Sequence, residues 1–280
     1  EYAGFTVTKT VDNGGALDAD NAAIAYPATF GYHAACTLAD RSVLLVDFTL
    51  TDGGSRAFAV LPAGATCTVA ETADGNAAST SLELIQAGDA QTIEPGDPFE
   101  FTLIRDTSTD PSSPGLSVVA FTNHFTIGAV TITKELTGTG ADAWGKATFT
   151  VKLACTLDTD ADPATEDAVV YSASHDVSKA SPTWTVSTLP TGAACQVTET
   201  AHGGANSTVI SDGGQFTVGA DPAAPSEVIV TNNFGTGSVE VTKQVLVDGT
   251  ASPETEPYAS ANFQVRLTCT RMVNGILEGV

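Results

Sequence analysis

Three lysines stand in β-strand patterns where an apolar residue is expected. Residues 5–11 alternate apolar residues with threonines, and Lys9 falls in the apolar row. Two further strands of the same kind carry the same feature, at Lys134 and Lys243. Lysine is almost never buried without a partner. Three such lysines at equivalent places in one chain therefore predict a shared chemical role.

Glutamate and asparagine recur in the same manner. Side chains two residues apart in a strand share a face. If Cys67 and Cys195 point inward, then Glu71 and Glu199, each four residues later, also point inward. In the closing strand of each repeat, Asn123 and Asn232 also fall in the apolar row. Each complete repeat is thus expected to direct one Lys, one Glu and one Asn into its interior.

Three interpretations of these polar sets are open. The lysine and glutamate could form a buried salt bridge, supported by the asparagine, although desolvation offsets most of its benefit. The lysine could instead extend to the rim, with the glutamate solvated near a strand end. In the third interpretation, the lysine amine has displaced ammonia from the asparagine carboxamide, leaving a neutral amide crosslink.

The crosslink interpretation has a consistent chemistry. Burial disfavours the ammonium and so favours a nucleophilic amine. Burial also favours a protonated carboxyl, which could polarise the asparagine carbonyl. The fold would hold both reactants in contact and replace a bimolecular step. Because the reaction occurs once per domain, it is self-processing and the protein is not expected to be an enzyme.

The elements that position these residues form a long repeat. The closing asparagine precedes the next lysine by the same interval twice, from 123 to 134 and from 232 to 243. The repeats predict domains at 1–127 and 128–236, and an incomplete third at 237–280. Short strands separated by turn residues, with no helical periodicity, predict an all-β fold. We expect tandem immunoglobulin-like β-sandwich domains, arranged by short links as an elongated rod.

The five cysteines follow the repeat. We expect disulfides within each domain, Cys36 with Cys67 and Cys155 with Cys195, which would indicate an oxidising, extracellular setting. The alternatives are small buried apolar residues or a metal site, but no Cys-x-x-Cys pair favours zinc. Cys269 has no counterpart in the third repeat, as expected if that repeat is incomplete.

The order of these residues resembles that of CnaB-type domains, which are prealbumin-like, reversed immunoglobulin folds of Gram-positive pilins and surface adhesins. The similarity lies in the opening lysine, the Glu-Thr-Ala strands at 67–73 and 195–201, and the closing asparagine. It implies autocatalytic Lys–Asn isopeptide bonds with the glutamate as catalyst. The implied sets are Lys9, Glu71 and Asn123, and Lys134, Glu199 and Asn232. The cysteine pairs are not general in that family, and in some repeats a disulfide could replace the amide bond.

Composition limits the class of partner. The chain has 33 acidic and 11 basic residues and a formal net charge of −22, which argues against nucleic acids and anionic membrane surfaces. No apolar run approaches the roughly 18 residues of a membrane helix, and no signal peptide is visible.

One acidic segment has alternating oxygen ligands of the kind that Ca²⁺ binds. The candidate ligands are Asp158, Asp160, Asp162 and Glu166. Pro163 stands where an EF-hand loop needs glycine, so a solvated acidic loop is the alternative. We expect no cofactor.

Together these features predict the structural stalk of a cell-surface adhesin or pilus-like protein. The expected partners are neighbouring domains or subunits of a larger fibre and an unknown host or cell-surface ligand. The alternative is a module that binds a host protein or glycan through its loops. Exposed aromatic side chains would mark such a module, and the candidates are Trp144, Trp184, Tyr26 and Tyr32.

Overall fold

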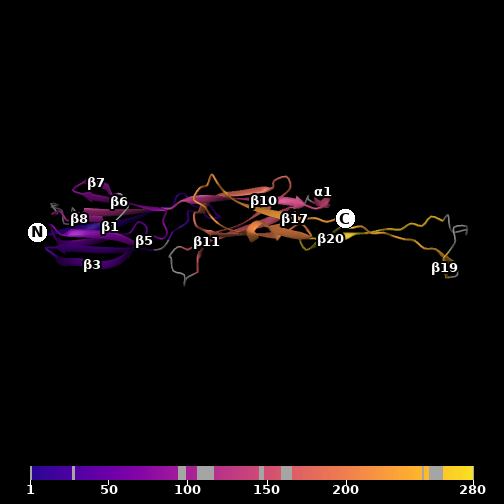
Figure 1. The fold of residues 1–280 in the computed structure, drawn as a ribbon, viewed down its shortest axis with the longest axis horizontal. Coiled ribbons are helices and arrows are strands. Elements are labelled where there is room, and N and C mark those ends of the chain that lie inside the picture. The colour runs from indigo at the N-terminus through magenta and orange to yellow at the C-terminus, as the bar shows by residue number, and fades with distance from the viewer. Residues whose placement is uncertain are drawn as a thin grey trace.

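The structure is a computed structural model that describes most of the chain. The described residues are 2–26, 29–93, 99–105, 117–144, 148–158, 166–247, 249–251 and 261–279. They form two β-sandwiches, which follow one another along the long axis of the molecule (Figure 1). The all-β architecture predicted from the sequence is therefore confirmed.

The first sandwich consists of two facing sheets. One has the strand order β4-β1-β9-β6-β7, and the other has the order β3-β2-β5-β8. The strands of the first sheet are Ser55–Pro62 (β4), Tyr2–Asp12 (β1), Ser117–His124 (β9), Ser79–Gln86 (β6) and Asp89–Ile93 (β7). Those of the second are Arg41–Leu50 (β3), Phe30–Leu38 (β2), Thr66–Ala73 (β5) and Phe99–Thr102 (β8).

The second sandwich repeats this plan. Its sheets have the orders β13-β10-β17-β15 and β12-β11-β14-β16. The first comprises Thr183–Pro190 (β13), Ile127–Thr137 (β10), Ser226–Asn233 (β17) and Ser207–Ile210 (β15). The second comprises Ala168–Val177 (β12), Phe149–Leu157 (β11), Ala194–Ala201 (β14) and Gln215–Thr217 (β16). Two short helical turns, Ala141–Trp144 (α1) and Ser211–Gly214 (η1), accompany these strands, and the periodicity of the sequence did not indicate them.

The first and last strands of each sandwich lie side by side and run in the same direction. β1 pairs with β9 in parallel, so that Lys9 is opposite Phe121 and Val11 is opposite Asn123. β10 and β17 repeat this register in the second sandwich. The chain therefore enters each sandwich at one end and leaves it at the other.

Strand alternation fills the space between the sheets. In β1, Phe5, Val7 and Lys9 are buried, whereas Thr6 and Thr8 are only partly covered. This is the period of two expected of a strand that has one face on a core. The lysine therefore occupies a true core position.

The two sandwiches are in direct contact. β9 ends at His124 and β10 begins at Ile127, and the amide of Thr191 donates to the carbonyl of Thr126 over 3.0 Å. Gly128 is required here, because a Cβ at this position would lie 1.9 Å from the carbonyl oxygen of Gly219. The backbones at this junction thus approach more closely than any side chain would permit.

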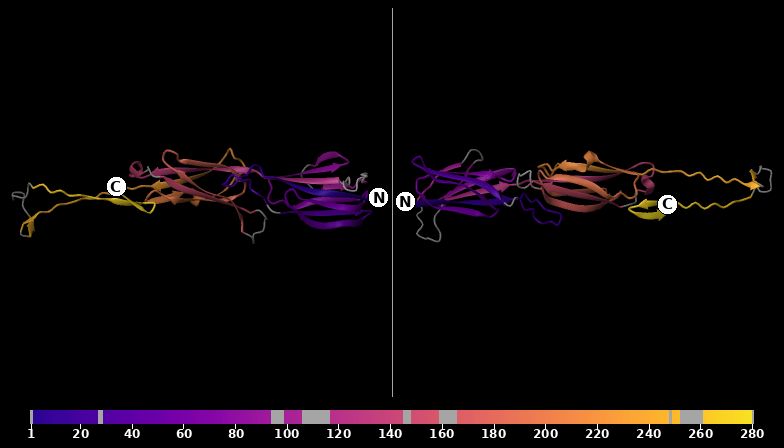
Figure 2. Two further views of the ribbon diagram at one scale, coloured as in Figure 1. Left: turned by 180° about the vertical axis from the view of Figure 1, so that it is seen from behind. Right: turned by 90° about the horizontal axis from the view of Figure 1, so that it is seen from below.

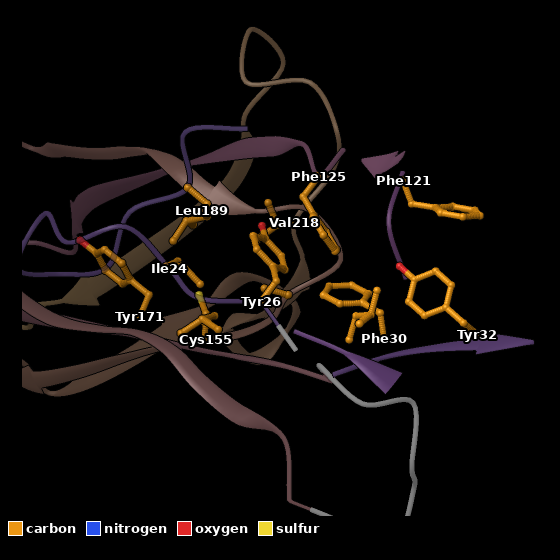
Figure 3. Packing of buried hydrophobic residues seen from close by; sticks show 14 of the residues in the cluster. Ile24, Tyr26, Phe30, Tyr32, Phe121, Phe125, Cys155, Tyr171, Leu189 and Val218 are labelled. Atoms are coloured by element: carbon orange, nitrogen blue, oxygen red, sulfur yellow. The ribbon is translucent and has the colours of Figure 1, made fainter. Parts of the chain in front are cut away.

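The loop that follows β1 also crosses the junction. The amide of Leu17 donates to the carbonyl of Thr188 in the second sandwich over 3.0 Å. The ring of Tyr26 stacks on Phe125, with centroids 3.7 Å apart. Figure 3 shows Ile24 beside Leu189 of the second sandwich, so the apolar core continues from one sandwich into the other.

The described residues after β17 contain only short strands. These are Leu246–Val247 (β18), Thr250–Ala251 (β19), Thr270–Val273 (β20) and Ile276–Gly279 (β21). The hairpin β18–β19 lies far beyond the second sandwich, and β20–β21 lies next to it (Figure 2). The amide of Gly203 donates to Oδ1 of Asn274 over 2.9 Å, which ties the β20–β21 turn to the second sandwich.

Candidate functional site

The first sandwich brings three buried polar side chains together from two sheets. Lys9 on β1 and Asn123 on β9 come from neighbouring strands of one sheet, and they are 1% and 0% exposed. Glu71 comes from β5 in the facing sheet, and its side chain is 6% exposed. The cluster therefore spans the core between the two layers. The residues predicted from strand alternation do meet.

One carboxylate oxygen accepts hydrogen bonds from both the lysine amine and the asparagine carboxamide. Nζ of Lys9 donates to Oε1 of Glu71 over 2.9 Å. Nδ2 of Asn123 donates to the same oxygen over 3.2 Å. The carboxylate can thus take a proton from the amine and deliver one to the amide nitrogen without moving between partners.

The second sandwich repeats this arrangement. Nζ of Lys134 lies 3.1 Å from Oε1 of Glu199, and Nδ2 of Asn232 donates to that oxygen over 3.0 Å. Lys134 also donates to the carbonyl oxygen of Val230 over 3.1 Å. The two domains differ in sequence at most positions, yet both place a lysine and an asparagine around one carboxylate oxygen.

A backbone carbonyl fixes the orientation of each asparagine amide. Nδ2 of Asn123 donates to the carbonyl of Asp74 over 2.9 Å, and Nδ2 of Asn232 donates to that of His202 over 3.1 Å. A carbonyl oxygen can only accept, so the nitrogen must face it. The amide oxygen consequently points to the opposite side.

A threonine hydroxyl lies at that side in both domains. Thr80 donates to Oδ1 of Asn123 over 2.9 Å, and Thr208 donates to Oδ1 of Asn232 over 2.9 Å. Reasoning from the sequence assigned carbonyl polarisation to the glutamate and missed these residues. A signal was present, because each threonine follows its glutamate by nine residues. In a chain rich in threonine, that spacing alone did not distinguish them.

Burial changes the protonation of the lysines. Desolvation holds the pKa of Lys9 below its ordinary value of 10.5, although the contact with Glu71 acts in the opposite direction. The pKa of Lys134 is lowered for the same reason. Each amine lies over an aromatic ring, 4.1 Å from the centroid of Phe30 and 4.9 Å from that of Phe149. The ring face attracts a cation, but desolvation is the largest effect at both lysines and favours the neutral, nucleophilic amine.

Each sandwich also contains a disulfide on the strand that carries the glutamate. Cys36 is bonded to Cys67, and Cys155 is bonded to Cys195, which are the pairs expected from the sequence. In both domains the two cysteines are direct partners on neighbouring strands. The bond therefore ties the strand that carries the glutamate to the next strand of its sheet.

The segment 237–280, predicted to be an incomplete third repeat, has no comparable site among the residues that the structure describes. Lys243 is exposed, and its Nζ donates to the adjacent carbonyl of Gln244. Cys269 is an exposed free thiol. The inward position expected for Lys243 is thus not observed.

Two of the four predicted calcium ligands lie outside the described residues. Asp160 and Asp162 lie there, whereas Asp158 and Glu166 are described. Within the described part of the chain, no group of three or more acidic, histidine or cysteine side chains could hold a metal ion.

Two of the expected binding aromatics are not on the surface. Tyr26 is 9% and Tyr32 is 1% exposed, so the suggestion that they form binding platforms is wrong. Both rings pack against aromatic residues of the core, Tyr26 against Phe125 and Tyr32 against Phe48. A third candidate, Trp184, stacks on His175. No helix in the described ranges is long and apolar enough to cross a membrane.

The fold and the two clusters define a protein of tandem β-sandwich domains, each with a buried lysine, glutamate and asparagine. The chain belongs to the family described as "Domain of unknown function (DUF5979)", whose model matches residues 5–126 and 130–235. No curated protein sequence matches the chain.

The chain is similar to several solved structures. The major pilin of Streptococcus pyogenes is 15% identical, with a TM-score of 0.44, covering 84% of this chain and 100% of the pilin. The shaft pilin spaA of Lactobacillus rhamnosus GG is 13% identical, with a TM-score of 0.36, covering 86% and 100%. A single B repeat of the collagen-binding surface protein of Staphylococcus aureus is 14% identical, with a TM-score of 0.27, covering 84% and 100%. These Gram-positive pilins and the B repeat represent the group that the sequence was expected to resemble.

Proposed function

We propose that the two sandwiches are stalk domains of a protein displayed outside a Gram-positive cell, and that each domain closes one Lys–Asn amide bond. The stalk would be an elongated rod within a longer fibre, in contact with neighbouring domains or subunits. The bonds would join Lys9 to Asn123 and Lys134 to Asn232. Its role is structural, and the only reaction is the crosslinking of the domain itself.

One observation carries this proposal. In both domains, a buried amine lies 2.9 or 3.1 Å from the carboxylate oxygen to which the buried carboxamide donates, Oε1 of Glu71 or Glu199. Removing two charges from water costs about as much as a buried ion pair returns. A crosslink removes both charges, since the lysine becomes an amide and the glutamate can hold a proton. This explains why the arrangement is present twice.

The hydrogen-bond contacts suggest the sequence of steps in the reaction. The ammonium of Lys9 gives a proton to Oε1 of Glu71, and the neutral amine attacks Cγ of Asn123. The new bond forms between Nζ and Cγ, while the electron pair of the carbonyl moves onto Oδ1. Oε1 then delivers that proton to Nδ2, Nζ gives its surplus proton to Oε1, and ammonia leaves as the carbonyl re-forms, so the glutamate ends protonated. Proximity replaces a bimolecular encounter with an intramolecular step.

The position of the bond suits a molecule under tension. Because β1 and β9 are parallel neighbours, force between the two ends of the sandwich shears one strand against the other. A bond between Lys9 and Asn123 carries that force directly from the first strand to the last. All strands between them are then shielded. The disulfides would add resistance to protease and fit an extracellular location.

Intact mass after full denaturation and reduction tests the proposal. Each bond releases one ammonia, so two bonds predict a deficit of about 34 Da from the sequence mass. Peptide mapping should recover branched peptides that join Lys9 to Asn123 and Lys134 to Asn232. A protein of full sequence mass would reject the crosslinks, and the clusters would then be ordinary buried ion pairs.

A further inference from the structure

We infer that Thr80 and Thr208 are catalytic residues of crosslink formation, supplying the hydrogen bond that stabilises charge on the asparagine oxygen. This inference rests on the proposed function. Its basis is the contact of each hydroxyl with Oδ1, over 2.9 Å in both domains. Oδ1 is the atom that gains negative charge when the amine attacks Cγ.

The geometry excludes the glutamate from this task. The carbonyls of Asp74 and His202 hold Nδ2 of the two asparagines and so turn Oδ1 away from the glutamate oxygen Oε1. That glutamate oxygen faces the two nitrogens instead. The proton transfers and the carbonyl polarisation are therefore divided between two side chains, with Glu71 or Glu199 serving the nitrogens and the threonine serving the oxygen.

A second contact holds each hydroxyl in place. Oγ1 of Thr80 lies 3.4 Å from Oε2 of Glu71, and Oγ1 of Thr208 lies 2.8 Å from Oε2 of Glu199. A hydroxyl has one proton and two lone pairs, and the amide oxygen can only accept. While the glutamate is a carboxylate, Oε2 competes with Oδ1 for the single hydroxyl proton, and once Oε1 is protonated the uncharged Oε2 is the weaker acceptor. The proton that Oε1 gains from the lysine thus leaves the threonine hydroxyl free to donate to Oδ1 as negative charge develops there.

No atom is transferred to or from the threonine in the completed reaction. The amine forms the bond to Cγ, the glutamate moves protons between nitrogens, and ammonia leaves. The hydroxyl donates its hydrogen bond most strongly while Oδ1 is charged and returns to a neutral contact in the product. Removing one such donor from an enzyme active site slows catalysis by about 10²–10³-fold.

The test compares the two domains within one molecule. The full chain is synthesised in a cell-free system under oxidising conditions, quenched in denaturant and reductant at intervals, and followed by intact mass and branched-peptide mapping. We expect Thr80→Val to slow the Lys9–Asn123 bond by about 10²-fold and to leave the Lys134–Asn232 bond unchanged. Thr208→Val should give the converse, and Thr80→Ser, which retains the hydroxyl, should restore most of the rate.

Ser81→Ala is the matched control, because Ser81 is adjacent on β6 and contacts His124 instead of the cluster. If T80V does not fold by circular dichroism, Thr80→Ala replaces it. Loss of ammonia at the same rate in wild type and in the folded T80V or T80A variant would overturn the role of threonine and leave the proposed function intact. A wild-type chain that never loses ammonia would overturn both this inference and the proposed function.

Discussion

The phenol of Tyr32 donates a hydrogen bond to Oε1 of Glu71 over 2.9 Å. The second sandwich has no such donor at the matching position, because Val151 lies there opposite Glu199. The two domains therefore hold the same reactive groups, but the first supplies one more hydrogen bond to the carboxylate. Burial and the neighbouring carboxylate raise the pKa of Tyr32, so the phenol remains a donor at neutral pH.

This difference predicts unequal rates of closure. The additional donor stabilises the charged carboxylate and so disfavours transfer of the lysine proton to it. A hydrogen bond to a charged group contributes about 1.5–3 kcal/mol, and about 1.4 kcal/mol changes a rate tenfold. We expect Tyr32→Phe to accelerate the Lys9–Asn123 bond by about tenfold, as measured by time-resolved intact mass. Tyr171→Phe, a buried tyrosine of the second sandwich, is the control, and a slower bond in Y32F would contradict this account.

Replacing either glutamate should block formation of the Lys–Asn bond in its own domain only. Glu71→Gln and Glu199→Gln keep the shape of the side chain but cannot accept the lysine proton. Each should slow one bond by at least about 10²-fold and halve the mass deficit, while the double variant shows none. Glu135→Gln is the control, because Glu135 is next to Lys134 but exposed. Normal crosslinking in E71Q would exclude the glutamate as the proton carrier.

Force should distinguish crosslinked domains from the others. A single wild-type molecule pulled by its ends should not lengthen by unfolding of either sandwich, since the bond connects the first strand to the last. In E71Q or E199Q, with the disulfide intact, the affected domain should unfold and release roughly 20–30 nm of chain. Single-molecule force spectroscopy measures this step. Its appearance in the crosslinked wild type would show that the bond does not carry the force.

Tyr26 gives a prediction about the junction. Its hydroxyl is buried and has no hydrogen-bond partner among the described residues. A buried unsatisfied group costs about 1–3 kcal/mol, so Tyr26→Phe should raise the unfolding temperature at pH 7. Tyr26→Ala removes the stack on Phe125 and should lower it. A lower unfolding temperature in Y26F would show that the hydroxyl has a partner.

The same residue makes stability depend on pH. Burial raises the pKa of Tyr26 from 10.0 to about 12. Because the folded-state pKa lies above the unfolded one, the contribution of Tyr26 is complete below pH 10 and is lost as the pH rises to about 12. Thermal unfolding measured at intervals across this range should show a smaller loss of stability in Y26F than in wild type. Equal losses would indicate that Tyr26 does not titrate in this range.

Much of the fold and site was predictable because it depends on local alternation. Period-two patterning predicts that Lys9 and Asn123 point inward, and an inward Cys67 extends the same prediction to Glu71. The repeat predicts which cysteines pair. Thr80 could not be recognised in this way, since its role depends on the orientation of an amide in another strand. Tyr32 was misassigned for a similar reason, because only the packed core shows that its hydroxyl reaches Glu71. The contact of Leu17 with the second sandwich also follows from no local pattern.

The parallel pairing of β1 with β9, and of β10 with β17, has an evolutionary consequence. If the terminal strands were antiparallel, the chain would enter and leave each domain at the same end, and an added domain would not extend the array. With this topology, every duplication carries the growing polypeptide farther from its origin. The length of such an array can then change by one domain at a time, through recombination between repeats. No individual domain has to change.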